Sequence, residues 1–401
     1  MNEPWSKPWR ISSPLASLQT AAVYRARVRG CLLGGALGDA LGYPVEFASL
    51  DRIRASHGRH GVTGLVPGAQ GAVGLISDDT QMTLFTVEAL IQAHAREREK
   101  GIGGAWPLLL RQAYERWLET QSKPGPPQPG PPQPGPLLSG SPQPGAPLSA
   151  PPQPGPGQPA PSYPGVPAGG LVTEAWLYAR RAPGNACLSG VAQMYAPDPA
   201  LPLDGTPGEV NPDSKGCGTM MRSAPFGLAA SADAAFAMAA RGAQITHGHP
   251  TGYYAAGALA AIVAHLVAGD SLEGAVLRTL RLLERHRGHT ETTAALRAAL
   301  ELAADGAPTA EKVESLGAGW VAEEALAIGV YCALAEPVAV RALLLAVNHS
   351  GDSDSTGSIC GNLLGARHGD TGLPHTWVAQ VEGRARIAAL ADDLAAECAR
   401  G

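Results

Sequence analysis

The sequence predicts an all-α protein, built as a single compact domain of many helices that a low-complexity insert interrupts. Three observations lead to this prediction. The 401-residue chain is rich in alanine and leucine, which favour helix, and its β-branched runs are few. Apolar residues recur at helical spacing in several long segments. Patterns typical of strands are nearly absent.

The expected helices follow from that spacing. After Ser77-Asp78-Asp79-Thr80, apolar residues recur at helical spacing from Leu84 onward. Three more helices are expected at 251–269, 271–286 and 322–336, and another runs through Ile359 and Leu363 near the C-terminus. Ser271 suits an N-cap, and Gly269 lies where the preceding helix should end.

Composition divides the chain into four parts. Residues 1–23 form a polar, proline-containing arm, and residues 24–122 begin the helical domain, which continues over 171–401. Between them, residues 123–170 repeat the sequence PPQPG or close variants with a period of five, so the segment is not collagen-like. This composition cannot bury a core, so we expect a disordered insertion tolerated at the surface instead of a specific ligand for another domain.

Charge and cysteine usage exclude several classes of protein. The formal net charge of −5 and the pI of about 6.1 give no electrostatic reason to bind nucleic acid or an anionic membrane. The N-terminus has no apolar signal segment, and no run of about 20 apolar residues predicts a membrane span. The six cysteines are scattered without metal-ligand spacing, which indicates reduced thiols in a cytoplasmic protein.

The first chemically informative segment is GCLLGGALGDALGYPVEF, residues 30–47. Its glycines, at 34, 35, 38 and 42, permit close approach of helices. Pro44 should end the helix near Gly42, which puts Asp39 on the last turn, where the helix dipole disfavours a carboxylate. Glu46 lies just beyond, and on its own it reads as an exposed loop acid.

Two further segments place acids and hydroxyls at expected helix starts. One is Ser77-Asp78-Asp79-Thr80, where a simple N-cap needs only one acid. The other contains Asp352, Asp354, Ser355 and Thr356. An EF-hand is excluded here, because its twelfth position would be a leucine instead of a bidentate glutamate. A D-x-D-x-T phosphatase motif fits the letters but should follow a buried strand, so it remains a weaker alternative.

Taken together, the two acidic helix starts predict a metal site. Four aspartates flanked by hydroxyls supply the hard oxygen ligands that suit Mg²⁺ or Mn²⁺. If they converge in a pocket of low dielectric constant, they repel each other unless cations neutralise them.

Two other segments carry weaker signals. Gly216 and Gly218 permit backbone amides to approach a phosphate, although the sequence contains no P-loop. His247 and His249 have the spacing of a zinc pair, but without a nearby third ligand a hydrogen-bonding role is the better interpretation.

The order of these segments resembles the ADP-ribosylglycohydrolase family, which includes the dinitrogenase reductase-activating glycohydrolase and the mammalian ADP-ribosylhydrolases. The matching motifs are GGALGDALG, SDDTQMT, GCGTMMRSAP, THGHP and GDSDSTGSICGNLLGA, and the similarity covers residues 24–121 and 170 onward. The resemblance implies an all-α fold with two Mg²⁺ or Mn²⁺ ions. It assigns Ser77, Asp78 and Asp79 to one ion, and Asp352 and Ser355 to the other, with Asp354 bridging.

The same resemblance implies the remaining site residues and the reaction. Glu46, Asp79 and Asp354 would be catalytic, and Gly216, Gly218, Thr219 and His247 would hold the phosphates and distal ribose of ADP-ribose. Three departures stand out: Ser355 replaces the usual threonine, Cys217 replaces a common asparagine, and the proline-rich insert has no counterpart. We expect a monomeric hydrolase that releases ADP-ribose from a modified protein side chain, arginine in particular, or from an ADP-ribose-containing small molecule. The alternatives are a non-catalytic ADP-ribose-binding or structural member of the fold and, more weakly, a metal-dependent phosphatase.

Overall fold

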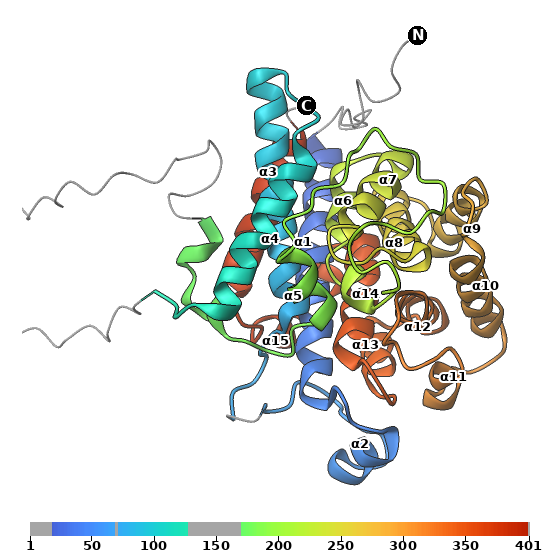
Figure 1. The fold of residues 1–401 in the computed structure, drawn as a ribbon. Coiled ribbons are helices and arrows are strands. Elements are labelled where there is room, and N and C mark those ends of the chain that lie inside the picture. Colours follow the sequence, from blue (N-terminus) through green and yellow to red (C-terminus); the bar gives the residue numbers. More distant parts are fainter. Residues whose placement is uncertain (1–17, 69–70, 127–169, 400–401) are drawn as a thin grey trace, which may run out of the picture.

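The computed structural model describes residues 18–68, 71–126 and 170–399, and this part of the chain is built from helices (Figure 1). Its residues form no β-strand, only two isolated bridges, Pro67 with Val73 and Gly216 with Val321. The predicted all-α fold is confirmed. Most of the predicted N-terminal arm, and residues 127–169 of the predicted insert, lie outside the described residues.

Sixteen α-helices are described. They are α1 Leu18–Gly42, α2 Leu50–His57, α3 Asp78–Lys100, α4 Trp106–Ser122, α5 Asn185–Val191, α6 Ala224–Ala229, α7 Ala232–Ala243, α8 Pro250–Ala268, α9 Leu272–Leu283, α10 Thr290–Ala304, α11 Ala310–Glu314, α12 Ala322–Ala335, α13 Ala339–Val347, α14 Ser353–His368, α15 His375–Val378 and α16 Arg384–Ala399. Short 3₁₀ turns lie at η1 Tyr43–Val45, η2 Gly170–Thr173, η3 Ala175–Tyr178, η4 Cys217–Thr219 and η5 Asp370–Gly372.

Helix α1 runs through the middle of the molecule, between the α3–α4 pair and the group formed by α6, α7 and α8 (Figure 1). It begins at Leu18, inside the predicted arm of residues 1–23, because the stretch after Leu18 contains good helix formers. It ends at Gly42, as the proline at position 44 predicts, and η1 follows.

Glycines hold α1 and α14 at unusually close distance. A Cβ on Gly34 would lie 2.2 Å from the carbonyl oxygen of Gly361, and one on Gly38 would lie 1.9 Å from that of Gly357. Larger residues would force the backbones apart, so the spacing of four residues on both helices fixes how they cross. This crossing brings the end of α1 next to the start of α14, where Asp352 and Asp354 lie.

Helix α8 is a largely buried core helix. It is long and apolar enough to cross a membrane, and the other described helices do not meet that test. However, 83% of its apolar window is buried inside the protein, and it packs on α6, α7 and α9. Its apolar surface is therefore satisfied by core packing. Gly269 ends the helix in the left-handed conformation, and Ser271 caps α9, as predicted.

A candidate metal centre

The first acidic segment opens α3 and is held from α1. Ser77 is the N-cap residue, and its hydroxyl accepts a hydrogen bond from the Asp79 amide at 3.2 Å. Asp39, fully buried on the last turns of α1, accepts hydrogen bonds from the amides of Ser77 at 3.0 Å and Thr80 at 3.1 Å, and from the Thr80 hydroxyl. The buried carboxylate of Asp39 therefore fixes the position of the α3 N-terminus and its two aspartates.

The second acidic segment opens α14. Asp352 is the N-cap residue and accepts a hydrogen bond from the Ser355 amide at 3.3 Å. The amide of Asp352 donates to the carbonyl of Ala318 at 2.8 Å, so the loop before α12 covers this helix start. Both acidic segments are thus N-terminal caps, as the sequence predicts, but the first carries two carboxylates beyond its Ser77 cap and the second carries one beyond its Asp352 cap.

The two segments meet. The hydroxyl of Ser355 donates to the Asp79 carboxylate at 2.9 Å, across 276 residues of sequence. Ligand oxygens of Glu46, Asp352 and Asp354 lie within 4.8 Å of one another. Asp78, which is also buried, accepts a long hydrogen bond of 3.4 Å from the Gly184 amide.

Glu46 is not the exposed loop acid that its local sequence suggests. It is half-buried at the end of η1, because the glycine crossing carries that turn to the start of α14. Its Oε2 is buried without a hydrogen-bond partner among the described protein atoms. An unsatisfied carboxylate oxygen beside other carboxylates is a place where a cation or water is expected.

The acids of the cluster raise one another's pKa values. Burial, followed by the charges of Asp354, Asp352, Asp78 and Asp39, raises the pKa of Glu46 to about 11. Burial and then Asp354 raise the pKa of Asp39 to about 7. The same two causes raise the pKa values of Asp78, Asp79 and Asp352 well above their usual range. Carboxylates in such a setting are ionised together only if cations join them.

The donor set fits divalent cations that prefer oxygen. The orphaned oxygen of Glu46, the convergent aspartates and the hydroxyls of Ser77 and Ser355 supply hard ligands, which suit Mg²⁺ or Mn²⁺ better than softer metals. The residues that would hold cations are Ser77, Asp78, Asp79, Asp352, Asp354 and Ser355, with Glu46 beside them.

The glycine loop at 216–218 borders the cluster through Cys217. The Cys217 thiol lies 2.6 Å from the Asp352 carboxylate, and its amide donates to the carbonyl of Trp320 at 3.1 Å. Burial, and then the Asp352 charge, raise the pKa of this thiol well above its usual value. Thr219 is fully buried and donates its hydroxyl to the Gly252 carbonyl at 3.0 Å, so that hydroxyl supports the loop.

His247 lies against the same loop and is held as a neutral donor. A Cβ on Gly216 would be 3.2 Å from its Nε2. Its Nδ1 is 2.7 Å from the hydroxyl of Thr246, which accepts a hydrogen bond from the buried Arg222 guanidinium. The single proton of that hydroxyl therefore goes to Nδ1, because its other acceptor, the Ala243 carbonyl, is at 3.4 Å.

The consequence is a defined tautomer for His247. Nδ1 accepts, so the ring proton is on Nε2, which faces the glycine loop. Burial, together with the Arg222 charge, lowers the pKa of His247 to about 3, so the ring stays neutral. His249 does not join it in a metal pair. Its Nδ1 accepts from the Thr251 amide at 3.2 Å and caps α8.

Sequence reasoning missed three residues that support this site. The local sequence shows Asp39 only as an unfavourable acid at a helix end, because its partners at the start of α3 lie about 40 positions away. Arg222 and Thr246 carried no local signal at all. One signal could have indicated a role for Asp39. It lies four residues after Gly35, on the part of the helix where the spaced glycines predict a contact with another helix.

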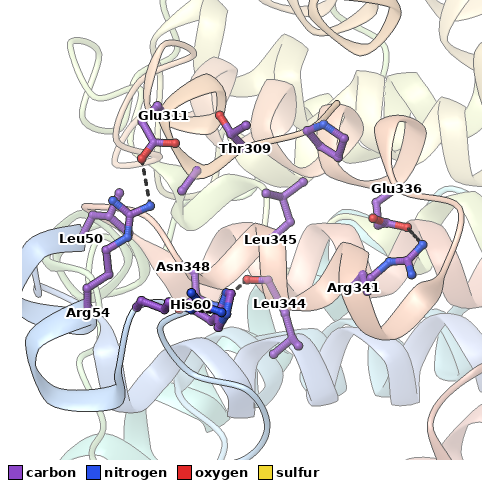
Figure 2. Close-up of a pocket in the computed structure, with 13 residues that line it drawn as sticks. Leu50, Arg54, His60, Thr309, Glu311, Glu336, Arg341, Leu344, Leu345 and Asn348 are labelled. Carbon is purple, nitrogen blue, oxygen red and sulfur yellow. Dashed lines mark hydrogen bonds and ion pairs between the residues drawn. The ribbon is translucent and has the colours of Figure 1, made fainter. Parts of the chain in front are cut away.

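A separate pocket of about 330 Å³ lies between α2, α11 and α13 (Figure 2). Arg54 and Arg341 line it, but each pairs with a glutamate, Glu311 and Glu336 respectively, at 2.8 Å. Arg59, which also lines the pocket, donates to the His60 ring at 2.8 Å instead of to an acid. Asn348, on its wall, exchanges two hydrogen bonds with the Val62 backbone and so ties the segment before Asp352 to the loop after α2.

Comparisons with known proteins agree on one family. The family model described as ADP-ribosylglycohydrolase matches residues 20–401. Among solved structures, the chain is similar to one titled "ADP-ribosylglycohydrolase-related protein complex", with a TM-score of 0.58 and 20% identity, covering 94% of this chain and 99% of that one. At that identity the likeness concerns the fold. No curated protein matches the sequence.

Proposed function

The chain belongs to the ADP-ribosylglycohydrolase family, whose model covers residues 20–401, and on this basis we propose that it removes ADP-ribose from a modified protein side chain, arginine in particular. The observation that carries the proposal is the meeting of the two acidic helix starts. Ser355 of one donates to Asp79 of the other, and Glu46 joins Asp352 and Asp354 within 4.8 Å.

Two divalent cations complete the proposed site. Ser77, Asp78 and Asp79 would hold one and Asp352 and Ser355 the other, with Asp354 between them. When bound, Mg²⁺ or Mn²⁺ at this position supplies positive charge that orients the ribose hydroxyls and polarises water. The extra carboxylates beyond those needed for helix capping support this role.

Glu46 is proposed as the general base. Water attacks C1″ of the ribose as the bond to the side-chain nitrogen breaks, and the transition state has oxocarbenium character. Glu46 takes the proton from that water, and the departing guanidine nitrogen gains a proton from the site or from solvent. This role needs an ionised carboxylate. Cations that neutralise the neighbouring aspartates would lower the raised pKa of Glu46, and so would leave its carboxylate ionised.

The diphosphate is proposed to lie on the glycine loop. A Cβ on Gly216 or Gly218 would lie 3.2 Å from the His247 ring, so these glycines let the loop pack closely on His247, whose Nε2–H points toward it. The loop amides and this N–H are the donors proposed for the phosphates. Thr219 supports the loop from behind through its bond to Gly252. This places the phosphates next to Cys217 and Asp352, and hence next to the proposed metal centre.

The fold weakens one alternative, and one experiment tests the other. The phosphatase interpretation loses its expected setting, because the described residues contain no strand to precede Asp352. A non-catalytic ADP-ribose-binding protein remains the second candidate. Peptides ADP-ribosylated on arginine or on serine are incubated with the protein, with Mg²⁺ or with EDTA, and free ADP-ribose is measured.

Release from the arginine-linked peptide that depends on Mg²⁺ supports the proposal. Binding of ADP-ribose without release from either peptide supports the non-catalytic alternative instead. Asp354→Ala serves as the inactive control. We also propose that the protein works in the cytoplasm as a monomer, and sedimentation of the purified chain tests the second point.

A further inference from the structure

Two exposed aromatic side chains stack on each other beside the acidic cluster. The rings of Phe47 and Trp320 have centroids 5.1 Å apart and planes inclined by 22°. Phe47 is 68% exposed and Trp320 is 39% exposed, whereas the other large exposed apolar side chains of the described residues are aliphatic. Core packing does not account for two aromatic rings held together in solvent.

Both residues come from segments that form the edge of the cluster. Phe47 follows Glu46 directly, at the end of η1. The turn is held by two backbone hydrogen bonds, from the Glu46 amide to the Gly42 carbonyl and from the Ala48 amide to the Val45 carbonyl. Trp320 belongs to the loop whose Ala318 carbonyl accepts the Asp352 amide. The pair therefore lies where the acidic cluster meets solvent.

The backbone of Phe47 is strained in the conformation that presents its ring. Its φ of 65° is in the left-handed region, which is uncommon for a bulky aromatic residue. Such strain is unfavourable and persists where the surrounding structure enforces it, often at ligand sites. Here the enforced conformation holds the ring against Trp320 instead of in the core.

An aromatic face beside carboxylates suits a planar cation. The negative face of an aromatic ring attracts a guanidinium, and arginine also stacks flat on it. The charged groups that act most strongly on Glu46 are all aspartates, so the local field favours a positive group. A serine acceptor has neither charge nor a flat face and gains little from this surface.

We propose that the Phe47–Trp320 pair binds the guanidinium of the arginine that carries ADP-ribose, and so selects arginine-linked substrates. This inference rests on the proposed function. Phe47 adjoins Glu46, the group proposed to act at the bond that breaks, so the pair lies at the acceptor end of the substrate. Stacking of the adenine ring is the competing possibility, and the experiment is designed to reveal it.

The test compares Trp320→Ala, Trp320→Tyr and Phe47→Leu with the wild type. Rates are measured over a range of concentrations on peptides with arginine-linked or serine-linked ADP-ribose, and ADP-ribose binding is measured by calorimetry. Leu277→Ala, an exposed apolar residue on α9, is the matched control. Melting temperatures identify any variant that fails to fold. If Trp320→Ala fails to fold, Trp320→Tyr and Phe47→Leu remain as tests of the pair.

Loss of one cation–π contact should raise KM for the arginine-linked peptide about 5-fold to 30-fold in Trp320→Ala. Trp320→Tyr should stay within about threefold of the wild type. The serine-linked peptide and ADP-ribose binding should change less than about twofold in every variant, as should everything measured for Leu277→Ala. Binding of the arginine-linked peptide to Glu46→Gln and to Glu46→Gln/Trp320→Ala gives the same comparison without turnover.

Three results would overturn the inference alone. They are an unchanged arginine KM, equal losses on both peptides, and a loss of ADP-ribose binding that marks an adenine platform. Failure of the wild type to release ADP-ribose from either peptide is a different outcome, since it refutes the proposed function and the inference with it.

Discussion

The carboxylate of Asp39, near the end of α1, accepts hydrogen bonds from both the amide and the hydroxyl of Thr80, in the first turn of α3. A helix N-terminus normally receives its cap from its own sequence. Here Ser77 supplies the local cap, and an acid from another helix adds a second one. The contact couples the glycine-mediated crossing of α1 and α14 to the position of Asp78 and Asp79.

Asp39→Ala is expected to destabilise the fold by roughly 1–3 kcal/mol, because it leaves the buried amides of Ser77 and Thr80 without an acceptor. Asp39→Asn keeps an acceptor and should cost less. Denaturant unfolding measures both, and Glu301→Ala, an exposed acid on α10, should stay within about 0.5 kcal/mol of the wild type. Equal stability of Asp39→Ala and Glu301→Ala would show that the contact contributes nothing.

How far the sequence predicts this fold depends on how local each signal is. Ser77, Ser271 and Gly269 act within one turn of their own position, and the structure has them as predicted. The crossing of α1 and α14 was visible only as glycines that permit close packing. The sequence does not predict which helix packs against those glycines, because the partner glycines lie more than 300 residues away.

The site residues also differ in how far the sequence predicts them. The two acidic helix starts were predicted to converge from charge and resemblance, and Asp79 and Ser355 do meet. The burial of Glu46 was not predictable from its neighbours, since a proline-containing turn after a helix is usually exposed. Its position depends on the tertiary crossing that carries η1 to α14. The support of His247 by Arg222 and Thr246 is likewise tertiary and leaves no sequence pattern.

Both acidic segments are expected to contribute to one cation site. Asp78→Ala and Asp354→Ala should each reduce the gain in melting temperature that Mg²⁺ gives the wild type, because a ligand that binds only the folded state stabilises it by mass action. Melting curves at several Mg²⁺ concentrations measure this gain. A full response to Mg²⁺ in either variant would mean that its segment is only a helix cap.

The metal-free protein should lose stability as pH rises from about 6.5 to 8. The folded-state pKa values of Asp39, about 7, and Glu46, about 11, are above those of the unfolded chain. Above about pH 6.5 the histidines with lowered pKa values are neutral in both states. The raised acids then leave the folded state with more protons than the unfolded state, so unfolding becomes easier as pH rises. Melting temperatures in EDTA should therefore fall across this range.

Cations should remove much of that slope, because their binding displaces the protons. The same melting series with Mg²⁺ in excess should be flatter, and calorimetry in buffers of different ionisation enthalpy should detect proton release on binding. A slope that is the same in EDTA and in Mg²⁺ would contradict the assignment of the cluster as a cation site.

The tautomer of His247 is expected to depend on Thr246. ¹⁵N spectra of histidine-labelled protein should show a neutral ring with its proton on Nε2 down to about pH 4, since burial and Arg222 lower its pKa to about 3. Thr246→Ser keeps the hydroxyl and should preserve this signature. Thr246→Val removes it, and ADP-ribose affinity should then fall about fivefold to tenfold as the donor becomes disordered.

His247→Gln identifies the resonance, because its signal disappears from the spectrum. Observation of the Nδ1–H tautomer in the wild type would overturn the hydrogen-bond chain from Arg222. Preserved ADP-ribose affinity in Thr246→Val, with the tautomer altered as expected, would instead separate His247 from the phosphate subsite.

Glu46→Gln tests the proposed base. Glutamine has nearly the size of glutamate and keeps most of its hydrogen bonding, but it cannot accept a proton from water. Turnover on an arginine-linked substrate should fall by roughly 10²-fold to 10⁴-fold, the usual range for loss of a general base. Binding of the product ADP-ribose should change little, because the glycine loop, His247 and the metal centre are proposed to hold it.

Asp354→Asn should differ by weakening both binding and turnover, since Asp354 is proposed to lie between the two cations. Single-turnover rates and calorimetry with ADP-ribose distinguish the two patterns, and near-normal turnover in Glu46→Gln would remove Glu46 from the chemistry.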